Sequence, residues 1–190
     1  MKTPVAKESF TVIFDLDGTL IDSQPGIIDS LKFALADSGF CHELSSTQVP
    51  VGPPLSELIQ IFTNTNDLST INPIISKFKF HYDSSGFRSS RLFDGVYGFL
   101  SSLYCAHLNL YIATNKRLAP TIKILNHLSI DCFFNDVYAV DSCERNYDSK
   151  ASMLKALICN HCIDSNVLYL GDRYDDYSAT VANSIPVTDS

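Results

Sequence analysis

Two aspartates, Asp15 and Asp17, are separated by a single residue, and Gly18 and Thr19 follow Asp17 directly. Carboxylates that are crowded in this way repel one another unless a cation lies among them. Oxygen-rich ligand sets suit Mg²⁺, which also coordinates the oxygens of a phosphate group. A glycine at such a place lets the backbone approach a bound phosphate closely. The pattern predicts a magnesium site beside a phosphate-binding loop.

Residues far along the chain supply the other groups that phosphoryl transfer needs. Thr114 offers a hydroxyl, and the loop from Asn115 onward offers backbone N–H groups. Lys150 offers a positive charge to phosphate and to Asp15. Asp172 and Asp176 add carboxylates. These parts fit one reaction, in which Asp15 attacks phosphorus, Asp17 transfers a proton, and Mg²⁺ and Lys150 neutralise charge.

Short apolar runs come before most of these residues and predict β-strands buried on both faces. The predicted strands are Thr11–Phe14, Leu108–Ala113, Asp136–Val140 and Val167–Leu170. Amphipathic helices are expected between them, at Gly95–His107, Ala119–Leu128 and Ala151–Ile158. This alternation predicts an α/β fold with a doubly wound, Rossmann-like parallel sheet. The carboxyl ends of parallel strands share one edge of the sheet, so the polar residues should converge there.

The segment after the first strand breaks the alternation. Helical patterns cover Gly26–Ser38, Pro54–Thr63 and Ile71–Tyr82, with turn signals between them. We expect residues 23–88 to form an inserted helical cap domain and residues 1–22 and 89–190 to form the catalytic core. The insert carries phenylalanines that we assign to the core of the cap: Phe33, Phe62, Phe78 and Phe80.

Composition restricts the function classes. The chain has 190 residues, 45% of them hydrophobic, and a formal net charge of −7. That balance disfavours general binding to nucleic acid, which needs clustered Lys and Arg. Met1–Phe10 holds no apolar run of the signal-peptide kind, and no stretch has the length of a membrane helix. We expect a cytoplasmic protein with no membrane partner, either a monomer or a homodimer.

Other reactive side chains have an ordinary structural interpretation. The six cysteines lie in apolar segments, which predicts buried free thiols, and a CxxC at Cys159–Cys162 has no matching partner for a metal site. Lys116 and Arg173 adjoin the predicted site, but such residues are mostly exposed charges.

The motifs together resemble those of the haloacid dehalogenase-like hydrolase superfamily. Phe14–Ser23 resembles its first motif, Ile112–Lys116 its second, Ser149–Lys150 its third, and Gly171–Asp176 its fourth. Ala151 follows Lys150 where the family commonly has proline, and relatives usually continue beyond a segment like Ile185–Val187 with a further turn and helix.

The resemblance implies a role for each motif residue. Asp15 would be the nucleophile and a magnesium ligand, and Asp17 would be the general acid/base that ligates magnesium through its backbone carbonyl. Asp172 would be a further ligand, and Asp176 would support the metal shell. Thr114 would bind phosphate. The segment Val51–Glu57 looks like the cap loop of the phosphoglycolate phosphatase-like branch, whose small helical cap closes over the substrate.

Other functions on this fold remain open. A dehalogenase lacks the second aspartate of the first motif, so Asp17 argues against it. A sugar phosphomutase retains that aspartate, and a catalytically silent binding protein is the alternative outside the enzymes. The expected activity is a magnesium-dependent phosphatase acting on a small phosphorylated metabolite. Phosphoglycolate, a sugar phosphate, a nucleoside monophosphate and pyrophosphate all fit the motifs, because fold does not settle the substrate.

Overall fold

A computed structural model describes residues 10–40, 44, 49, 54–143, 146–163 and 166–186. Its centre is a parallel sheet in the order β5-β4-β1-β6. The strands are β1 (Thr11–Phe14), β4 (Asn109–Thr114), β5 (Asp136–Ala139) and β6 (Val167–Leu170). They lie within two residues of the predicted strands. Phe14 at the end of β1 is in register with Leu170 at the end of β6 and with Ile112 of β4, which runs two residues further, to Thr114.

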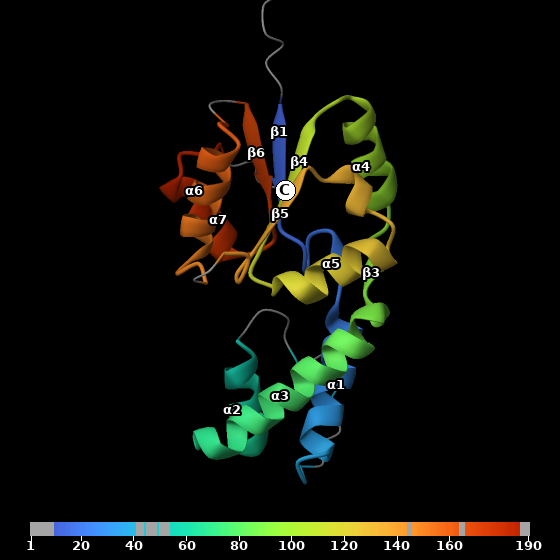
Figure 1. Cartoon of the computed structure of the whole chain (residues 1–190), viewed down its shortest axis with the longest axis vertical. Coiled ribbons are helices and arrows are strands. Elements are labelled where there is room, and N and C mark those ends of the chain that lie inside the picture. Colours follow the sequence, from blue (N-terminus) through green and yellow to red (C-terminus); the bar gives the residue numbers. More distant parts are fainter. Residues whose placement is uncertain are drawn as a thin grey trace, which may run out of the picture.

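Helices cover both faces of the sheet, as predicted (Figure 1). One face packs against α4 (Val96–Cys105), α5 (Leu118–His127) and the 3₁₀ turn η2 (Asp131–Phe133) through a cluster that includes Phe14, Leu100 and Ile112. The other face packs against α6 (Lys150–Asn160) and α7 (Tyr174–Ala182) through Ile13, Met153, Ala179 and their neighbours. Helix α7 was not predicted, because two of its three buried residues, Asp176 and Thr180, are polar.

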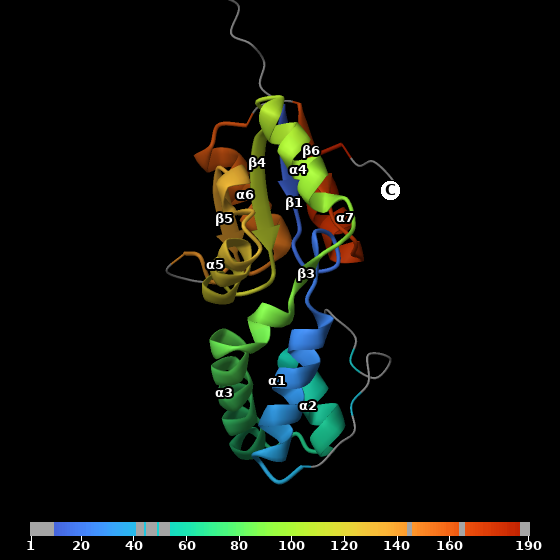
Figure 2. The ribbon, with the colours of Figure 1, turned by 90° about the vertical axis from the view of Figure 1, so that its right-hand side faces the viewer.

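Three helices form a separate layer beyond the carboxyl ends of the strands (Figures 1 and 2). They are α1 (Gln24–Ala36), α2 (Leu55–Thr63) and α3 (Leu68–Ser84), followed by the 3₁₀ turn η1 (Gly86–Ser89). We call this layer the cap. Its exact limits at residues 23 and 88 stay a prediction, and Val51–Pro53 of the expected cap loop lie outside the described residues.

The phenylalanines of the cap do not all lie in its core. The buried stripe of α3 consists of Ile71, Ile74, Phe78 and Tyr82, at helical spacing. Phe78 therefore matches its expected place, whereas Phe80 is on the opposite face of α3 and is 72% exposed. Phe33 of α1 is 40% exposed, because it stacks on His81 at the surface of the cap instead of entering its core.

A short antiparallel pair joins the cap to the sheet. Strand β2 (Ile21–Asp22) leads into α1, and β3 (Arg91–Leu92) leads out of η1; Ile21 pairs with Leu92 and Asp22 with Arg91. The sequence analysis placed no strands here, since two-residue strands carry no periodic signal. The pair brings the two chain crossings between sheet and cap side by side.

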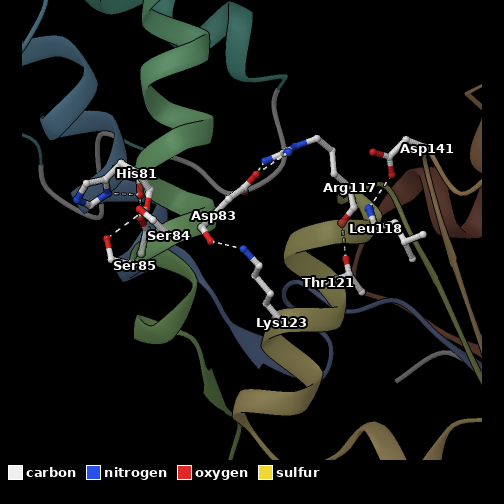
Figure 3. Close-up of polar contacts among 11 residues, drawn as sticks. His81, Asp83, Ser84, Ser85, Arg117, Leu118, Thr121, Lys123 and Asp141 are labelled. Carbon is white, nitrogen blue, oxygen red and sulfur yellow. Dashed lines mark hydrogen bonds and ion pairs between the residues drawn. The ribbon is translucent and has the colours of Figure 1, made fainter.

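Ion pairs and hydrogen bonds also tie the end of α3 to α5 (Figure 3). Arg117 donates from Nη1 to Asp83 Oδ2 at 2.9 Å and from Nη2 to Asp83 Oδ1 at 2.6 Å. The Nζ of Lys123 donates to the Asp83 carbonyl oxygen at 2.6 Å. On the core side, Asp141 Oδ1 accepts from the backbone N–H of Leu118 at 2.6 Å and so satisfies the first turn of α5. The contacts of Asp83 with Arg117 and Lys123 thus connect the cap to the core.

The described cysteines are exposed, which corrects the prediction of buried thiols. Cys105, Cys132, Cys143, Cys159 and Cys162 all lie at helix ends or in turns. Apolar sequence neighbours are a poor guide to burial at such places, because the chain turns away from the core there. Within the described part of the chain, no helix is long and apolar enough to cross a membrane.

The contact between α1 and η1 gives a test of the fold. A Cβ atom at Gly26 would lie 2.1 Å from the carbonyl oxygen of Gly86. Gly26→Ala should therefore force the two segments apart and lower the free energy of unfolding by about 1–3 kcal/mol. Gly98→Ala is the matched control: a Cβ there meets nothing within 4 Å, so it should raise stability by about 0.5–1 kcal/mol. Urea unfolding of both variants measures the difference, and equal stabilities would contradict this packing.

Candidate active site

A cavity of about 550 Å³ lies between the carboxyl ends of the strands and the cap. Several residues that the sequence analysis selected line it, namely Asp15, Asp17, Gly18, Thr114, Asn115 and Asp172. Lys150 and Asp176 lie behind Asp15, where both side chains are buried. The topology thus brings together residues as far apart in the sequence as Asp15 and Asp176, which are 161 positions apart, at the edge where α/β proteins bind ligands.

Asp15 is the first residue after β1 and is only 4% exposed. Its backbone N–H donates to the Leu170 carbonyl oxygen at 2.8 Å, which continues the β1–β6 pairing to the site. Its Oδ1 atom lies 3.0 Å from Lys150 Nζ. Burial raises the pKa of Asp15 to about 6, although the ammonium of Lys150 lowers it. Among the described residues, Oδ1 makes no conventional hydrogen bond besides this ion pair.

Lys150 begins α6 and lies between two carboxylates. Besides Asp15, its Nζ forms an ion pair with Asp176 Oδ1 and lies 5.6 Å from the centre of the Tyr169 ring. Ser149 caps α6, and its Oγ accepts from the Ser152 N–H at 3.1 Å. This cap sets the first turn of the helix, so Lys150 points at the end of β1.

Asp176 has partners on both oxygens. Its Oδ1 accepts from the Tyr169 hydroxyl at 2.8 Å, and its Oδ2 accepts from the Arg173 N–H at 3.0 Å. Burial, followed by the charge of Asp15, raises the pKa of Tyr169, so this hydroxyl remains a donor. The sequence analysis missed Tyr169 because a tyrosine within a buried strand carries no motif signal. The arrangement holds Asp176 and Lys150 in fixed positions beneath Asp15.

Asp17 is held by Ser23 and Lys116. The Ser23 hydroxyl donates to Asp17 Oδ1, and Lys116 Nζ lies 3.0 Å from Asp17 Oδ2. The side chain of Lys116 is 10% exposed and lies over the ring of Tyr82 from the cap, with Nζ 5.0 Å from the ring centre. Lys116 is thus part of the site, which corrects its interpretation as an exposed charge. Burial disfavours its charged form, but the Asp17 carboxylate outweighs this effect and raises the pKa of Lys116.

Gly18 allows Asp172 to reach the first motif. Gly18 has a φ angle of +84°, and a Cβ there would lie 2.3 Å from Asp172 Oδ2. Thr19 Oγ1 donates to Asp172 Oδ1 at 3.3 Å. A larger residue at position 18 would meet both backbone strain and the carboxylate. The close approach explains why the Asp-x-Asp turn ends in glycine.

Thr114 and Asn115 form the opposite side of the cavity floor. Thr114 ends β4 and is 1% exposed, and its Oγ1 accepts from the Lys116 N–H at 3.2 Å. That bond shapes the loop after β4. Asn115 is exposed to the cavity. Arg173 is half-buried and also lines the cavity, so it is not the fully exposed charge that the sequence suggested.

Three carboxylates at this edge are close enough to share a cation. Asp15, Asp172 and Asp176 each offer an oxygen atom, and these atoms lie within 4.8 Å of one another. The set contains oxygen donors alone, and Asp15 Oδ1 is buried without a conventional hydrogen bond among the described residues. Both properties fit a hard divalent cation such as Mg²⁺. The two oxygens of Asp176 are already committed, which favours Asp15 and Asp172 as the direct ligands.

Comparison with known proteins agrees with this geometry. The family model described as haloacid dehalogenase-like hydrolase matches residues 12–188. The 5'-nucleotidase of Pseudomonas aeruginosa is 30% identical over 92% of this chain and 79% of its own length. The phosphoglycolate phosphatase of Thiobacillus denitrificans is 25% identical over 93% of this chain and 80% of its own. The chain belongs to the haloacid dehalogenase-like hydrolase family, and its phosphoglycolate phosphatase-like relatives confirm the predicted resemblance.

A protein with a different name has the same fold. The tyrosine-protein kinase PtkA of Mycobacterium tuberculosis is 32% identical over 92% of this chain, and the chain spans 59% of the length of that relative. The solved structure of PtkA superposes with a TM-score of 0.80 and 28% identity, covering 96% of this chain and 83% of the other. Fold and family are therefore shared among proteins whose names describe different reactions, and the reaction must be argued from the site.

The elevated pKa of Asp15 gives a test on the metal-free protein. The folded pKa of about 6 exceeds the ordinary aspartate pKa of 3.8, so the folded state binds this proton more tightly than the unfolded chain does. In chelator, Asp15 therefore makes the protein less stable as the pH rises through this range. Asp15→Asn should gain about 1–2 kcal/mol relative to wild type between pH 5 and pH 7.5. Urea unfolding at the two pH values measures the gain, and parallel curves would show that Asp15 is not perturbed.

Proposed function

We propose that the chain is a magnesium-dependent phosphatase that hydrolyses a small phosphorylated metabolite through an aspartyl-phosphate on Asp15. The observation that carries this proposal is the buried Asp15 carboxylate, which borders the cavity and lies 3.0 Å from Lys150 Nζ. A desolvated carboxylate at the end of a rigid strand suits attack on phosphorus, because it loses little freedom or hydration in reacting.

The reaction would have two steps, and Asp17 would supply and accept the protons that they require. An oxygen of Asp15 bonds to phosphorus as the bond between phosphorus and the leaving oxygen breaks, and the leaving oxygen takes the bond's electron pair and a proton from Asp17. Asp17 then accepts a proton from water as the water oxygen attacks phosphorus. The bond between phosphorus and the Asp15 oxygen breaks, which regenerates the carboxylate and releases phosphate. Lys150 and Ser23 would keep the two carboxylates in position.

Asp15 and Asp172, with the backbone carbonyl of Asp17, would hold Mg²⁺, and Asp176 would support them through Lys150. When bound, the ion neutralises the phosphate dianion and the carboxylates around it. This role matters because the lining of the cavity includes several aspartates, which would otherwise repel the substrate: Asp15, Asp17, Asp22, Asp172 and Asp175.

The phosphate itself would be bound by the loops at the cavity floor. Gly18 lines the cavity floor, Thr114 and Asn115 present the loop after β4, and Lys150 adds charge from beneath. Residues 23–88 would act as the cap that excludes water during the reaction. Relatives named 5'-nucleotidase and phosphoglycolate phosphatase support phosphate ester chemistry but point to different leaving groups.

The metal requirement is directly testable. Hydrolysis of p-nitrophenyl phosphate should need added Mg²⁺ and stop in excess EDTA, because the carboxylate cluster repels phosphate without a cation. Asp172→Asn should raise the Mg²⁺ concentration needed for half-maximal activity by about tenfold or more. Asp29→Asn is the matched control, since Asp29 of α1 is exposed, does not line the cavity and does not belong to the cluster. Undiminished turnover in EDTA would reject the metal.

The two aspartates of the first motif should be separable by substitution. Asp15→Asn should abolish both phosphoenzyme formation and turnover, because it removes the nucleophile. Asp17→Asn keeps the backbone carbonyl, so it should still bind Mg²⁺ while turnover falls by about 10²–10⁴-fold. Rapid-quench labelling with a ³²P-phosphate ester and peptide mapping provide the measurement. Label on a residue other than Asp15 would overturn the mechanism.

A further inference from the structure

The cavity has two unlike ends. The floor, at the ends of the strands, is polar and contains Asp15, Asp17 and Thr114. The part of the lining that comes from the cap helices is mostly apolar: it has Ile27, Leu55, Leu58, Phe78 and Tyr82 beside the polar Gln24 and Lys79. Phe93 and Pro120 add apolar surface from the core side. A phosphate ester bound at the floor would thus direct its leaving group toward apolar side chains.

Two largely buried aromatic rings lie behind the cap part of the lining. The rings of Phe78 and Tyr82 lie nearly parallel, with an interplanar angle of 7° and their centres 5.6 Å apart. Phe93, just after β3, is 41% exposed although it lines the cavity. A large apolar side chain left open in a concave site indicates that a ligand covers it. A flat ring would fill this space better than a flexible hydroxylated chain.

Among the described residues, four cations line the cavity, namely Lys79, Lys116, Arg117 and Arg173, and two of them already have carboxylate partners. Lys116 is paired with Asp17, and Arg117 is paired with both oxygens of Asp83. Lys79 of α3 lines the cavity but is exposed to water. A two-carbon phosphate with a carboxylate would occupy little of about 550 Å³, a volume within the range of sites for larger organic ligands.

We infer that the substrate of this site is a phosphate monoester whose leaving group carries a planar, largely apolar ring, such as the nucleobase of a nucleoside 5'-monophosphate. The ring would pack against Leu55 and Phe93 while the phosphate lies at Asp15. The inference rests on the proposed phosphatase function and adds the class of the leaving group. It disfavours the phosphoglycolate-like substrate that the motifs suggested.

Two esters that share their reacting part measure the contribution of the ring to kcat/KM. Adenosine 5'-monophosphate and ribose 5-phosphate both carry phosphate on the primary hydroxyl of ribose and differ by the base. With Mg²⁺, kcat/KM should be at least about tenfold higher for the nucleotide, since burying an apolar group of this size contributes a factor of that order. Phosphoglycolate should be the poorest of the three. Equal or higher kcat/KM for ribose 5-phosphate or phosphoglycolate would overturn the inference.

Variants of Leu55 and Phe93 test whether the apolar part of the cavity lining causes the preference for the nucleotide. Leu55→Ser and Phe93→Ser should each lower kcat/KM for the nucleotide by about tenfold and change it less than about twofold for ribose 5-phosphate. Ile61→Ser is the matched control, because Ile61 lies on the same helix as Leu55, is 70% exposed and does not line the cavity. Equal losses on both esters would assign these residues to folding and contradict the inference.

A binding measurement separates this inference from the proposed chemistry. The Asp15→Asn protein should bind the nucleotide more tightly than ribose 5-phosphate in calorimetry with Mg²⁺ present, whatever the rate of turnover. Failure of wild type to hydrolyse any ester, p-nitrophenyl phosphate included, would reject the phosphatase function. Equal binding of the nucleotide and the sugar phosphate would reject the ring-bearing substrate instead.

Discussion

A buried ammonium group between two carboxylates is the interaction on which the site depends. Lys150 forms ion pairs with Asp15 and Asp176, and all three side chains are at least nine-tenths buried. Charges removed from water are costly unless their partners are close and their other bonds are satisfied. Tyr169 and the N–H of Arg173 satisfy Asp176, whereas Asp15 Oδ1 has no further conventional bond among the described residues. Of the two buried carboxylates, Asp15, which lines the cavity, thus has fewer hydrogen bonds than Asp176 behind it.

The sheet and most of the site were predictable from sequence, because both follow from short-range signals. Apolar runs that end in a polar residue located the strands, and the rule that ligands bind at the strand ends placed Asp15, Thr114 and Asp172 together. Lys116 was not predictable in this way. Its burial results from Asp17 and from Tyr82 of a helix in the cap, and nothing near position 116 in the sequence reports those partners.

The predictions from sequence that proved wrong share a physical cause. Phe80 and the described cysteines were assigned to the interior on their hydrophobicity, yet they lie on the outer face of a helix or at helix ends. The hydrophobicity of a side chain sets the free energy that its burial would contribute, but the fold determines which side chains are buried. Strands β2 and β3 were missed for a related reason: a two-residue pairing is created by the chain segments it joins and has no periodicity of its own.

The same small pairing has a consequence for how such a protein can change over generations. Because Ile21 lies opposite Leu92, the chain leaves the sheet layer and re-enters it at one place. Whatever is spliced between those two points leaves the order and register of the parallel strands untouched, and the entropic cost of closing a longer loop rises only slowly with its length. One catalytic platform can therefore accept successive lids of unrelated size and sequence, so chemistry and selectivity are free to evolve as separate parts.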